Sequence, residues 1–311
     1  MIYDVIIIGL GAAGISASIY AKRSGLNVAV INFNTPGGII NESSIVENYP
    51  GFKSISGPDL AFNFFEHFNS LDVPLFNEEV IDIIDGEYKK IVTKTNEYLC
   101  KRVIIASGRK PKKLGIKDED KFFGNGISYC ALCDGNFYKG KNVLVIGGGN
   151  SALESASYLS KIANKVYLLV RRDKLIGDSH LIEEVEQCSN VEIIYNTIVE
   201  ELIINNGLLT GVKTNTDEYN VDGIFVNIGY EPSTSILKSL ELEMDRNYII
   251  VDKNMETSIK GIYACGDIIK KDLYQLVTAV SEGAIAANNV FKSIKEWYFF
   301  NFIKKFDLIW D

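Results

Sequence analysis

Histidine, tryptophan and methionine are scarce in this chain of 311 residues, with two, two and three copies respectively. The two histidines, His67 and His180, and a single Cys-x-x-Cys pair leave too few ligands for a zinc site, so we expect no metal. Basic residues are outnumbered by acidic ones, 32 to 40, and the net charge is −8. Because a general nucleic-acid-binding protein is normally basic, we expect no nucleic-acid partner.

Long apolar runs are also missing, since none approaches the roughly 20 residues that a membrane helix needs. The first four residues lack the basic region and cleavage site of a signal peptide. The five cysteines, an odd number, fit a reducing compartment. We therefore expect a cytoplasmic protein without a membrane partner. Its 47% hydrophobic and 23% charged residues are typical of a globular chain, and the length suits about two domains.

Two stretches of the chain share a strand–helix–strand pattern typical of a βαβ unit. In each, an apolar β-branched run ends in glycines, and a helix and a second apolar run follow. The first covers strands 3–8 and 28–31 with helix 15–24, and the second covers strands 143–146 and 166–169 with helix 151–160. We therefore predict an α/β chain with two related nucleotide-binding units.

The first glycine motif, Gly9-Leu10-Gly11-Ala12-Ala13-Gly14, stands between the predicted strand and helix. Such a motif makes a tight turn, lets a pyrophosphate approach the backbone and permits close helix packing. The helix start then presents free N–H groups to the phosphates. The residue at the end of the second strand is Asn32, where an acid usually binds the ribose, and an amide still accepts one hydroxyl hydrogen bond. A glycine turn without a ligand is the alternative.

The second motif has the form G-x-G-x-x-A, with Gly147, Gly149, Asn150, Ser151 and Ala152. Its second strand ends in Arg171 and Arg172. A basic pair there suits the 2′-phosphate of NADPH better than the free hydroxyl of NADH. The alternative is a solvated cationic loop.

Between the two motifs lies Cys130-Ala131-Leu132-Cys133, followed by Asp134. A dithiol at a helix start favours a reactive thiolate, and Asp134 is an adjacent acid that can give a proton to a leaving thiolate. Two cysteines at this spacing by chance are the alternative. The two nucleotide motifs on either side favour electron transfer from a nucleotide cofactor to this dithiol.

These motifs resemble those of the low-molecular-weight thioredoxin reductases. The resemblance covers the chain from Met1 to about Asn289 in the family's order. Its segments are Tyr129-Cys130-Ala131-Leu132-Cys133-Asp134-Gly135, Pro36-Gly37-Gly38, Glu47-Asn48-Tyr49-Pro50-Gly51-Phe52, Gly229-Tyr230-Glu231-Pro232, and Ala264-Cys265-Gly266-Asp267 with Gln275 and Gly283-Ala284.

The resemblance implies two Rossmann-like, three-layer domains, one inserted in the other. The FAD domain would comprise residues 1–112 and 243–311, and the pyridine-nucleotide-like domain residues 113–242. In the first, Gly266 and Asp267 would hold the ribityl and phosphate region of FAD, and Gln275 and the helix after it would lie near the isoalloxazine. The further implied FAD contacts are Gly9, Gly11, Ala12, Ala13, Gly14, Asn32, Gly37, Gly38, Asn48, Ala106 and Leu276.

The resemblance also implies that Cys133 faces the flavin, Cys130 attacks thioredoxin and Asp134 is the acid. Members of the family are homodimers.

Several positions of this chain depart from the sequence pattern of the family. The basic motif His-Arg-Arg-x-x-x-Arg keeps only Arg171 and Arg172, since Val170 and Ile176 stand at its ends. Tyr274 and Ile39 replace a usual arginine and glutamine.

We predict an FAD-dependent thioredoxin reductase with NADPH as donor. The alternative is a ferredoxin-driven member of the family, because some clostridial members have degenerate NADPH motifs. A local basic patch, Arg109 to Lys113, would then face ferredoxin. From another class, a non-catalytic redox sensor carrying flavin and dithiol is the competing hypothesis. The aromatic tail from Trp297 is read as a packing face or dimer seam, or as a lid over the flavin.

Overall fold

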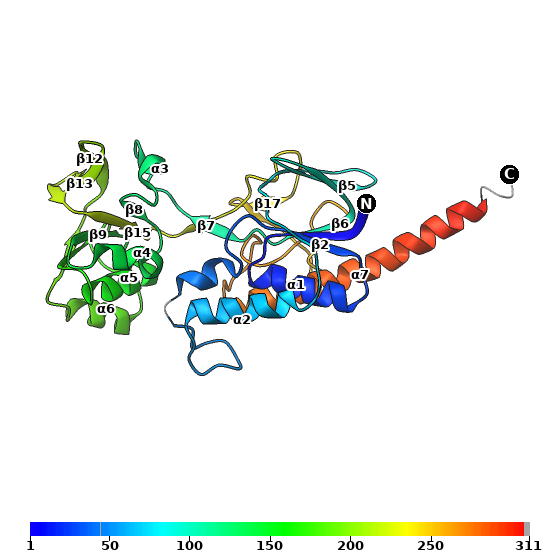
Figure 1. The fold of residues 1–311 in the computed structure, drawn as a ribbon, viewed down its shortest axis with the longest axis horizontal. Helices are drawn as coiled ribbons and strands as arrows, with labels where there is room; N and C mark the ends of the chain where they lie inside the picture. Colours follow the sequence, from blue (N-terminus) through cyan, green and yellow to red (C-terminus); the bar gives the residue numbers. More distant parts are fainter. Residues whose placement is uncertain (44, 308–311) are drawn as a thin grey trace. The chain divides into compact units, whose positions relative to one another are not determined.

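The computed structural model describes residues 1–43 and 45–307, and Figure 1 shows the path of the chain. The fold is α/β and divides into two compact units. The first unit comprises Met1–Arg109 and the chain from Pro232 onward, and the second comprises Lys110–Glu231. Each unit has its own sheet and its own core, so the predicted fold class is confirmed.

The first unit is built on a mainly parallel sheet with the strand order β3-β2-β1-β6-β5-β4, and β19 pairs with the second half of β6. Strands β4 and β5 are antiparallel additions at one edge. The central strands are β-branched and buried on both faces, as expected for a covered parallel sheet. The strands are β1 (Ile2–Ile8), β2 (Val28–Ile31), β3 (Leu75–Phe76), β4 (Val80–Ile84), β5 (Lys89–Thr93), β6 (Glu97–Ile105) and β19 (Ile262–Ala264).

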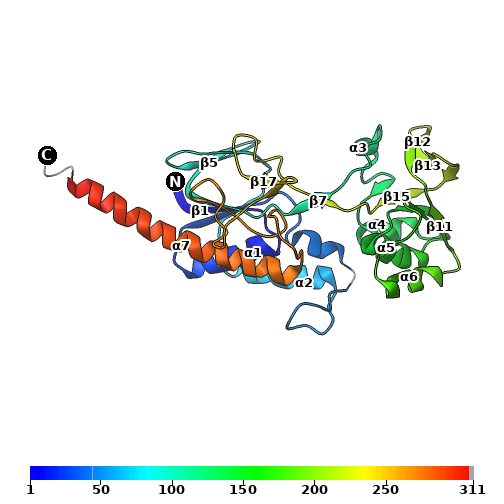
Figure 2. The ribbon, with the colours of Figure 1, turned by 180° about the vertical axis from the view of Figure 1, so that it is seen from behind.

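Helices cover one face of this sheet in both views (Figures 1 and 2). The other face packs against loops between residues 236 and 269, which include the short strands β17 (Met244–Asp245) and β18 (Tyr248–Ile249). The helices are α1 (Ala12–Arg23), the 3-10 turn η1 (Gly38–Glu42), α2 (Gly57–Asn69) and α7 (Leu276–Asp307). Ser56 begins α2 by accepting the Asp59 N–H at 3.1 Å, which satisfies one of the free donors at a helix start.

The second unit repeats the three-layer arrangement around a parallel sheet with the order β11-β10-β9-β15-β8. One face carries α5 and α6, and the other carries an antiparallel sheet (Figure 1). The parallel strands are β8 (Ile127–Ser128), β9 (Asn142–Ile146), β10 (Lys165–Val170), β11 (Val191–Tyr195) and β15 (Gly223–Val226). The remaining elements are α3 (Glu119–Phe122), α4 (Ala131–Asp134), η2 (Gly135–Tyr138), α5 (Asn150–Ser160), α6 (Ser179–Glu186), β12 (Val199–Asn205), β13 (Leu208–Thr214) and β14 (Glu218–Asn220).

The two chain crossings between the units form a small sheet of their own, in which β7 (Arg109–Pro111) pairs with β16 (Tyr230–Pro232). The sequence analysis placed the second crossing between residues 242 and 243, whereas the structure divides the chain after Glu231. The reason is that Leu237 and Leu240 are buried in the core of the first unit. The residues between the two positions therefore belong to the first unit.

Within the part of the chain that the structure describes, no helix combines the length and apolarity needed to cross a membrane. Among the same residues, no cluster of three or more His, Cys, Asp or Glu side chains is placed to hold a metal ion.

Candidate active site

The two cysteines of the predicted dithiol form a disulfide, with Cα atoms 5.4 Å apart. Cys130 precedes the short helix α4, and its Sγ accepts the Cys133 N–H at 3.1 Å. Cys133 is exposed and Cys130 is half-buried. The Cys100 and Cys265 thiols are fully buried, and burial raises the pKa of Cys100 to about 12 and that of Cys265 further. These two buried thiols are therefore poor nucleophiles.

Ser128 is a residue of this site that sequence reasoning missed. It ends β8 two positions before Cys130, and its side chain is buried. Its hydroxyl donates to Asp134 Oδ2 at 2.7 Å and accepts the Cys130 N–H at 3.0 Å. The only feature of the sequence that could have indicated its role is a serine two positions before the dithiol. The structure thus connects the acid and the cysteine backbone through one hydroxyl.

A buried carboxylate holds the segment that leads into the dithiol. The Tyr129 hydroxyl donates to Glu119 Oε1 at 2.7 Å, and the Glu119 carboxylate accepts the N–H groups of Leu114 and Gly115, both at 2.8 Å. Burial, followed by the bond to Glu119, raises the pKa of Tyr129 well above its ordinary value. Glu119 therefore fixes the backbone just before Cys130.

The three glycines of the first motif have different reasons to be glycine. A Cβ at Gly9, whose φ is +99°, would lie 2.4 Å from the Ala106 carbonyl oxygen, and one at Gly14 would lie 2.0 Å from the Gly9 carbonyl oxygen. At Gly11, with an ordinary φ of −80°, the nearest atom to such a Cβ is 3.9 Å away. Neither packing nor backbone conformation requires glycine there. A ligand that approaches the start of α1 does provide a reason.

The Pro-Gly-Gly segment completes this open surface. Gly37 has a φ of +93° and packs on Ala61, where a Cβ would approach the alanine methyl to 2.5 Å. Gly38 is exposed, and the nearest atom to a Cβ there is the Gly11 Cα, at 3.5 Å. Gly11 and Gly38 therefore leave a backbone-lined passage at the helix start, which fits the pyrophosphate of a dinucleotide.

The far end of the chain packs directly on the first motif. A Cβ at Gly266 would meet the Ala13 Cβ at 2.8 Å, and one at Gly283 would meet the Ala13 carbonyl oxygen at 2.2 Å. Ser16 Oγ donates to the Val280 carbonyl at 2.7 Å. Ala12 and Ala13 are buried under these contacts. The residues expected to bind FAD from both chain ends therefore do come together.

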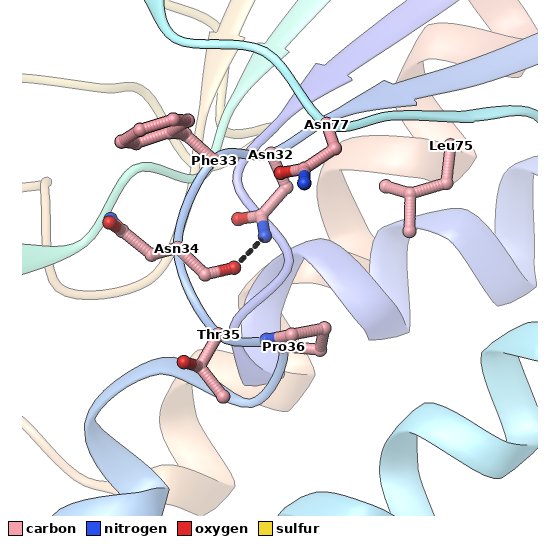
Figure 3. Close-up of a pocket in the computed structure, with 7 residues that line it drawn as sticks. All are labelled: Asn32, Phe33, Asn34, Thr35, Pro36, Leu75 and Asn77. Carbon is pink, nitrogen blue, oxygen red and sulfur yellow. Dashed lines mark hydrogen bonds between the residues drawn. The ribbon is translucent and has the colours of Figure 1, made fainter.

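A cavity of about 390 Å³ opens beside the end of β2 (Figure 3). Asn32 lines it, and its Oδ1 accepts the Leu10 N–H at 3.0 Å while its Nδ2 donates to the Asn34 carbonyl. The lining residues are Asn32, Phe33, Asn34, Thr35, Pro36, Leu75 and Asn77. Asn32 thus shapes the loop, and its Oδ1 already accepts a backbone N–H, so its role as a ribose ligand stays a prediction.

Three more of the expected FAD contacts, Asn48, Gln275 and Leu276, lie at or beside the start of α7, and a fourth, Ala106, lies beside Gly9. Asn48 Nδ2 donates to Gln275 Oε1 at 3.2 Å, which joins two segments 227 positions apart. Leu276 is the first residue of α7. Ala106 follows β6 and supports Gly9, as described above.

Asp267 belongs to a chain of alternating charges. Its Oδ2 accepts two hydrogen bonds from Arg109, and its Oδ1 lies 3.3 Å from Lys271 Nζ. Lys271 also pairs with Glu282 at 2.9 Å, and Glu282 accepts the Gly266 N–H at 2.9 Å. Burial raises the pKa of Glu282 despite the opposing effect of Lys271. This network fixes the loop that carries Gly266 and Asp267.

Tyr274, which replaces an expected arginine, packs against a different arginine. The Arg109 guanidinium carbon lies 4.5 Å from the centre of the Tyr274 ring, a cation–π distance. Lys271 Nζ is 5.3 Å from the same ring. The position that departs from the family pattern is therefore still next to a guanidinium group.

The second motif repeats the geometry of the first. Gly147 has a φ of +147°, and a Cβ there would lie 2.2 Å from the Asn227 carbonyl oxygen. Gly149 precedes α5, and a Cβ there would meet nothing within 4 Å. Ala152 is buried, Ser151 is exposed, and the Asn150 side chain bonds to Asp178. Asn150 thus has a structural partner of its own.

Arg171 and Arg172 follow β10 and are both exposed. Among the described residues, neither has an ion-pair partner. Ile176, where the family places another arginine, is 55% exposed. The two arginines are thus available to an anion, and the third cation is missing.

Asn227, at the end of β15, is a second residue that the sequence did not single out. Its Oδ1 is buried and has no hydrogen-bond partner within the described part of the chain. Its carbonyl lies against Gly147. Burying an oxygen without a hydrogen bond costs free energy. This acceptor beside Gly147 therefore fits a hydrogen-bond donor on a bound nucleotide.

The aromatic tail begins at the opposite end of the sheet from the first motif. Lys101 Nζ lies 4.6 Å from the Trp297 ring and 4.0 Å from the Tyr298 ring, and Trp297 also packs near Tyr88. Trp297 stands 21 positions after Leu276, about 30 Å along α7 at 1.5 Å per residue. Trp297 and Tyr298 therefore form a packing face. Trp310 lies outside the described residues.

The family model for pyridine nucleotide-disulphide oxidoreductases matches residues 3–283. A thioredoxin reductase of Mycoplasma genitalium is 42% identical over 93% of this chain and 95% of its own length. The structure of Lactococcus lactis thioredoxin reductase has a TM-score of 0.87 and 36% identity, covering 94% of this chain and 99% of that one. A ferredoxin-flavin thioredoxin reductase from Clostridium acetobutylicum has a TM-score of 0.54 and 33% identity, covering 94% and 98%.

These similarities extend over nearly the whole chain, and they agree with the motifs and with the disulfide that the structure contains. The predicted family is therefore confirmed. The chain belongs to the pyridine nucleotide-disulphide oxidoreductases, among the low-molecular-weight thioredoxin reductases, and is a flavoprotein dithiol–disulfide oxidoreductase.

Proposed function

We propose that the protein is an FAD-dependent thioredoxin reductase, which passes two electrons from NADPH through FAD and the Cys130–Cys133 disulfide to thioredoxin. The observation that carries this proposal is the disulfide itself, with Asp134 in the same helical turn, in a chain that has two nucleotide motifs. We further propose that it works in the cytoplasm, which its odd number of cysteines fits, and as a homodimer, as the family resemblance implies.

The first unit supplies the residues for FAD. Gly11 and Gly38 leave room for the pyrophosphate, and the cavity at Asn32 receives the adenosine end. Asp267 and Gln275 hold the other end of the molecule. When bound and reduced by the electron donor, the flavin would supply the two electrons that, with two protons, convert the disulfide to two thiols.

The dithiol then reduces thioredoxin by two exchange steps. The Cys130 thiolate attacks one sulfur of the thioredoxin disulfide, a mixed disulfide forms, and the other thioredoxin sulfur leaves and takes a proton from Asp134. The Cys133 thiol next loses its proton and attacks Cys130 Sγ, which breaks the mixed disulfide, and the second thioredoxin sulfur leaves and takes up that proton. The Cys130–Cys133 disulfide is restored, and thioredoxin has gained two electrons and two protons.

The case for NADPH rests on the second unit. Gly149 is open to a ligand, Asn227 Oδ1 lacks a partner among the described residues, and Arg171 and Arg172 are exposed. Two guanidinium groups suit a 2′-phosphate. Because Ile176 replaces a further cation, we expect NADPH to bind ten- to a hundredfold more weakly than with a full motif, which corresponds to about 1.5–3 kcal/mol.

A ferredoxin-driven reductase is the second candidate, favoured by the missing ends of the basic motif and by the similarity to the Clostridium acetobutylicum enzyme. The basic patch after Gly108 would be its docking surface. Within this patch Lys110 pairs with Glu231 at 3.3 Å and Lys113 pairs with Asp120 at 2.5 Å. This partial neutralisation weakens the attraction to an acidic partner, so NADPH remains our choice.

Anaerobic mixing of the oxidised holoenzyme with NADPH tests the donor directly. We expect flavin bleaching that saturates at high NADPH concentration, with NADPH preferred over NADH. No bleaching at any NADPH concentration, together with fast bleaching by photoreduced ferredoxin, would establish the second candidate. Failure to turn over thioredoxin more than once with either donor would favour the non-catalytic redox sensor.

A further inference from the structure

Ser128 occupies the centre of a small hydrogen-bond network at the dithiol. Its side chain is only 2% exposed, so water does not compete for its hydroxyl. The hydroxyl accepts the Cys130 N–H at 3.0 Å and lies 2.7 Å from Asp134 Oδ2. The Cys130 carbonyl is a second acceptor, at the longer distance of 3.2 Å.

A serine hydroxyl has one hydrogen to donate. The shorter distance directs it to Asp134 Oδ2, which must then accept rather than carry a proton. Among the described residues, the other carboxylate oxygen, Oδ1, has no hydrogen-bond partner. Oδ1 is therefore the oxygen left to carry the proton that the proposed mechanism assigns to Asp134, and the hydrogen bond at Oδ2 restrains rotation of the carboxyl group.

We propose that Ser128 is a positioning residue that acts through Asp134, holding Oδ2 so that Oδ1 delivers the proton to the departing thiolate. This inference rests on the proposed function and names one more residue of the same site. Ser128 itself transfers no proton, because its hydrogen stays in the bond to Oδ2 throughout.

The proton balance is simple. When Cys130 attacks a disulfide, one S–S bond forms and one breaks, and the departing sulfur carries the electron pair of the broken bond. The Asp134 Oδ1 proton moves to that sulfur, and Asp134 is left as a carboxylate. The Ser128 hydroxyl stabilises that carboxylate through Oδ2, since hydrogen bonds to charged acceptors are stronger than those to neutral ones.

A double-mutant cycle separates this role from a structural one. The holoenzyme is reduced anaerobically with dithionite and mixed with oxidised thioredoxin, and the rate of dithiol oxidation is measured. We expect Asp134→Asn to slow the reaction about a hundredfold and Ser128→Ala about tenfold. In the Asp134→Asn background, Ser128→Ala should add less than twofold, because no proton remains to be delivered. An equal tenfold loss in that background would overturn the proposal.

Matched variants guard against misfolding. Ser128→Thr keeps a hydroxyl and should retain at least half of the wild-type rate. Ser157→Ala removes a buried serine that donates to Glu184 at 2.5 Å in the same unit, and should leave the rate unchanged. A Ser128→Thr rate as low as that of Ser128→Ala, with the thermal midpoint unchanged, would contradict the role of the hydroxyl.

The leaving group provides a test that does not require thioredoxin. Hydroxyethyl disulfide releases a basic thiolate that needs a proton, whereas dithiodipyridine releases a weakly basic one that leaves unaided. Ser128→Ala should slow the first reaction about tenfold and the second less than twofold. Equal slowing of both would overturn the inference. Wild-type reaction with the small disulfides but not with thioredoxin would instead refute the proposed function and leave the Ser128 result standing.

Discussion

Arg109 donates two hydrogen bonds to a single oxygen of Asp267, from Nε at 3.0 Å and from Nη2 at 2.7 Å. The two residues are 158 positions apart, and both side chains are about four-fifths buried. Arg109 is also the last residue of the first of the two segments that make up the first unit, at the start of β7. The loop that is proposed to hold FAD is therefore tied to the strand by which the chain leaves that unit.

Replacing Arg109 with alanine should destabilise the apoprotein by about 1–3 kcal/mol and weaken FAD binding, because Asp267 loses its charge-assisted partner. Thermal melting and a fluorescence titration with FAD measure the two effects. Lys110→Ala is the matched control, since its pair with Glu231 is half exposed and contributes less than about 1 kcal/mol. If both variants melt and bind FAD alike, the buried pair does not stabilise the loop.

The glycines of the first motif should divide into two classes. Gly14→Ala forces a Cβ against the Gly9 carbonyl and should cost about 1–3 kcal/mol of stability or more. Gly11→Ala places its Cβ in open space, so the apoprotein should melt within about a degree of wild type. It should nevertheless lose FAD, because the methyl group fills the passage to the helix start. Full FAD occupancy in Gly11→Ala would show that the pyrophosphate does not bind at Gly11.

Arg171 and Arg172 should distinguish between the two nicotinamide nucleotides. Substituting both with alanine is expected to raise the KM for NADPH by about ten- to a hundredfold, while the KM for NADH changes less than threefold, because only NADPH carries the 2′-phosphate. Steady-state kinetics with both nucleotides measure this. Lys174→Ala, an exposed cation in the same loop, is the control. An equal rise of the KM for NADPH and for NADH would show that the two arginines have a general structural role.

The buried pair of Asp4 and Lys101 should make stability depend on pH. Burial favours a raised pKa of Asp4, but Lys101, the Asn27 N–H and the Tyr298 hydroxyl together lower it, and Asp4 in turn raises the pKa of Lys101. A lowered carboxyl pKa gives stability that is present above about pH 4 and is lost as the pH falls further. The raised lysine pKa gives stability that is lost only above about pH 10.

Urea unfolding between pH 3 and pH 7 should therefore show an acid loss of stability that is smaller in Asp4→Asn. That variant should also be on the order of 3 kcal/mol less stable at pH 7, since it leaves a buried ammonium without its carboxylate. Glu66→Gln, on the exposed side of α2, should leave both quantities unchanged. If the free energy of unfolding of Asp4→Asn falls with pH in parallel with that of wild type, other groups cause the loss of stability in acid.

Local patterns were sufficient for much of the fold. The strand at Tyr3 to Ile8, the glycine turn after it and the helix that follows are adjacent in the chain, and their apolar runs and glycines depend on neighbours a few residues away. The same is true of Cys130 and Cys133, which a single helical turn brings together. The boundary near Leu240 was misjudged because burial of two leucines in a distant core leaves no local signal.

By itself, the sequence determined the two nucleotide motifs, the dithiol and the family, because each depends on residue types at short, fixed spacings. Tertiary structure alone decided which distant groups meet: Gly283 on Ala13, Arg109 on Asp267, and the tail aromatics on Lys101. It also decided that the Ser128 hydroxyl faces Asp134. Hydrogen bonds and close backbone contacts require positions accurate to a few tenths of an ångström, and such positions are set by the packing of whole elements rather than by spacing along the chain.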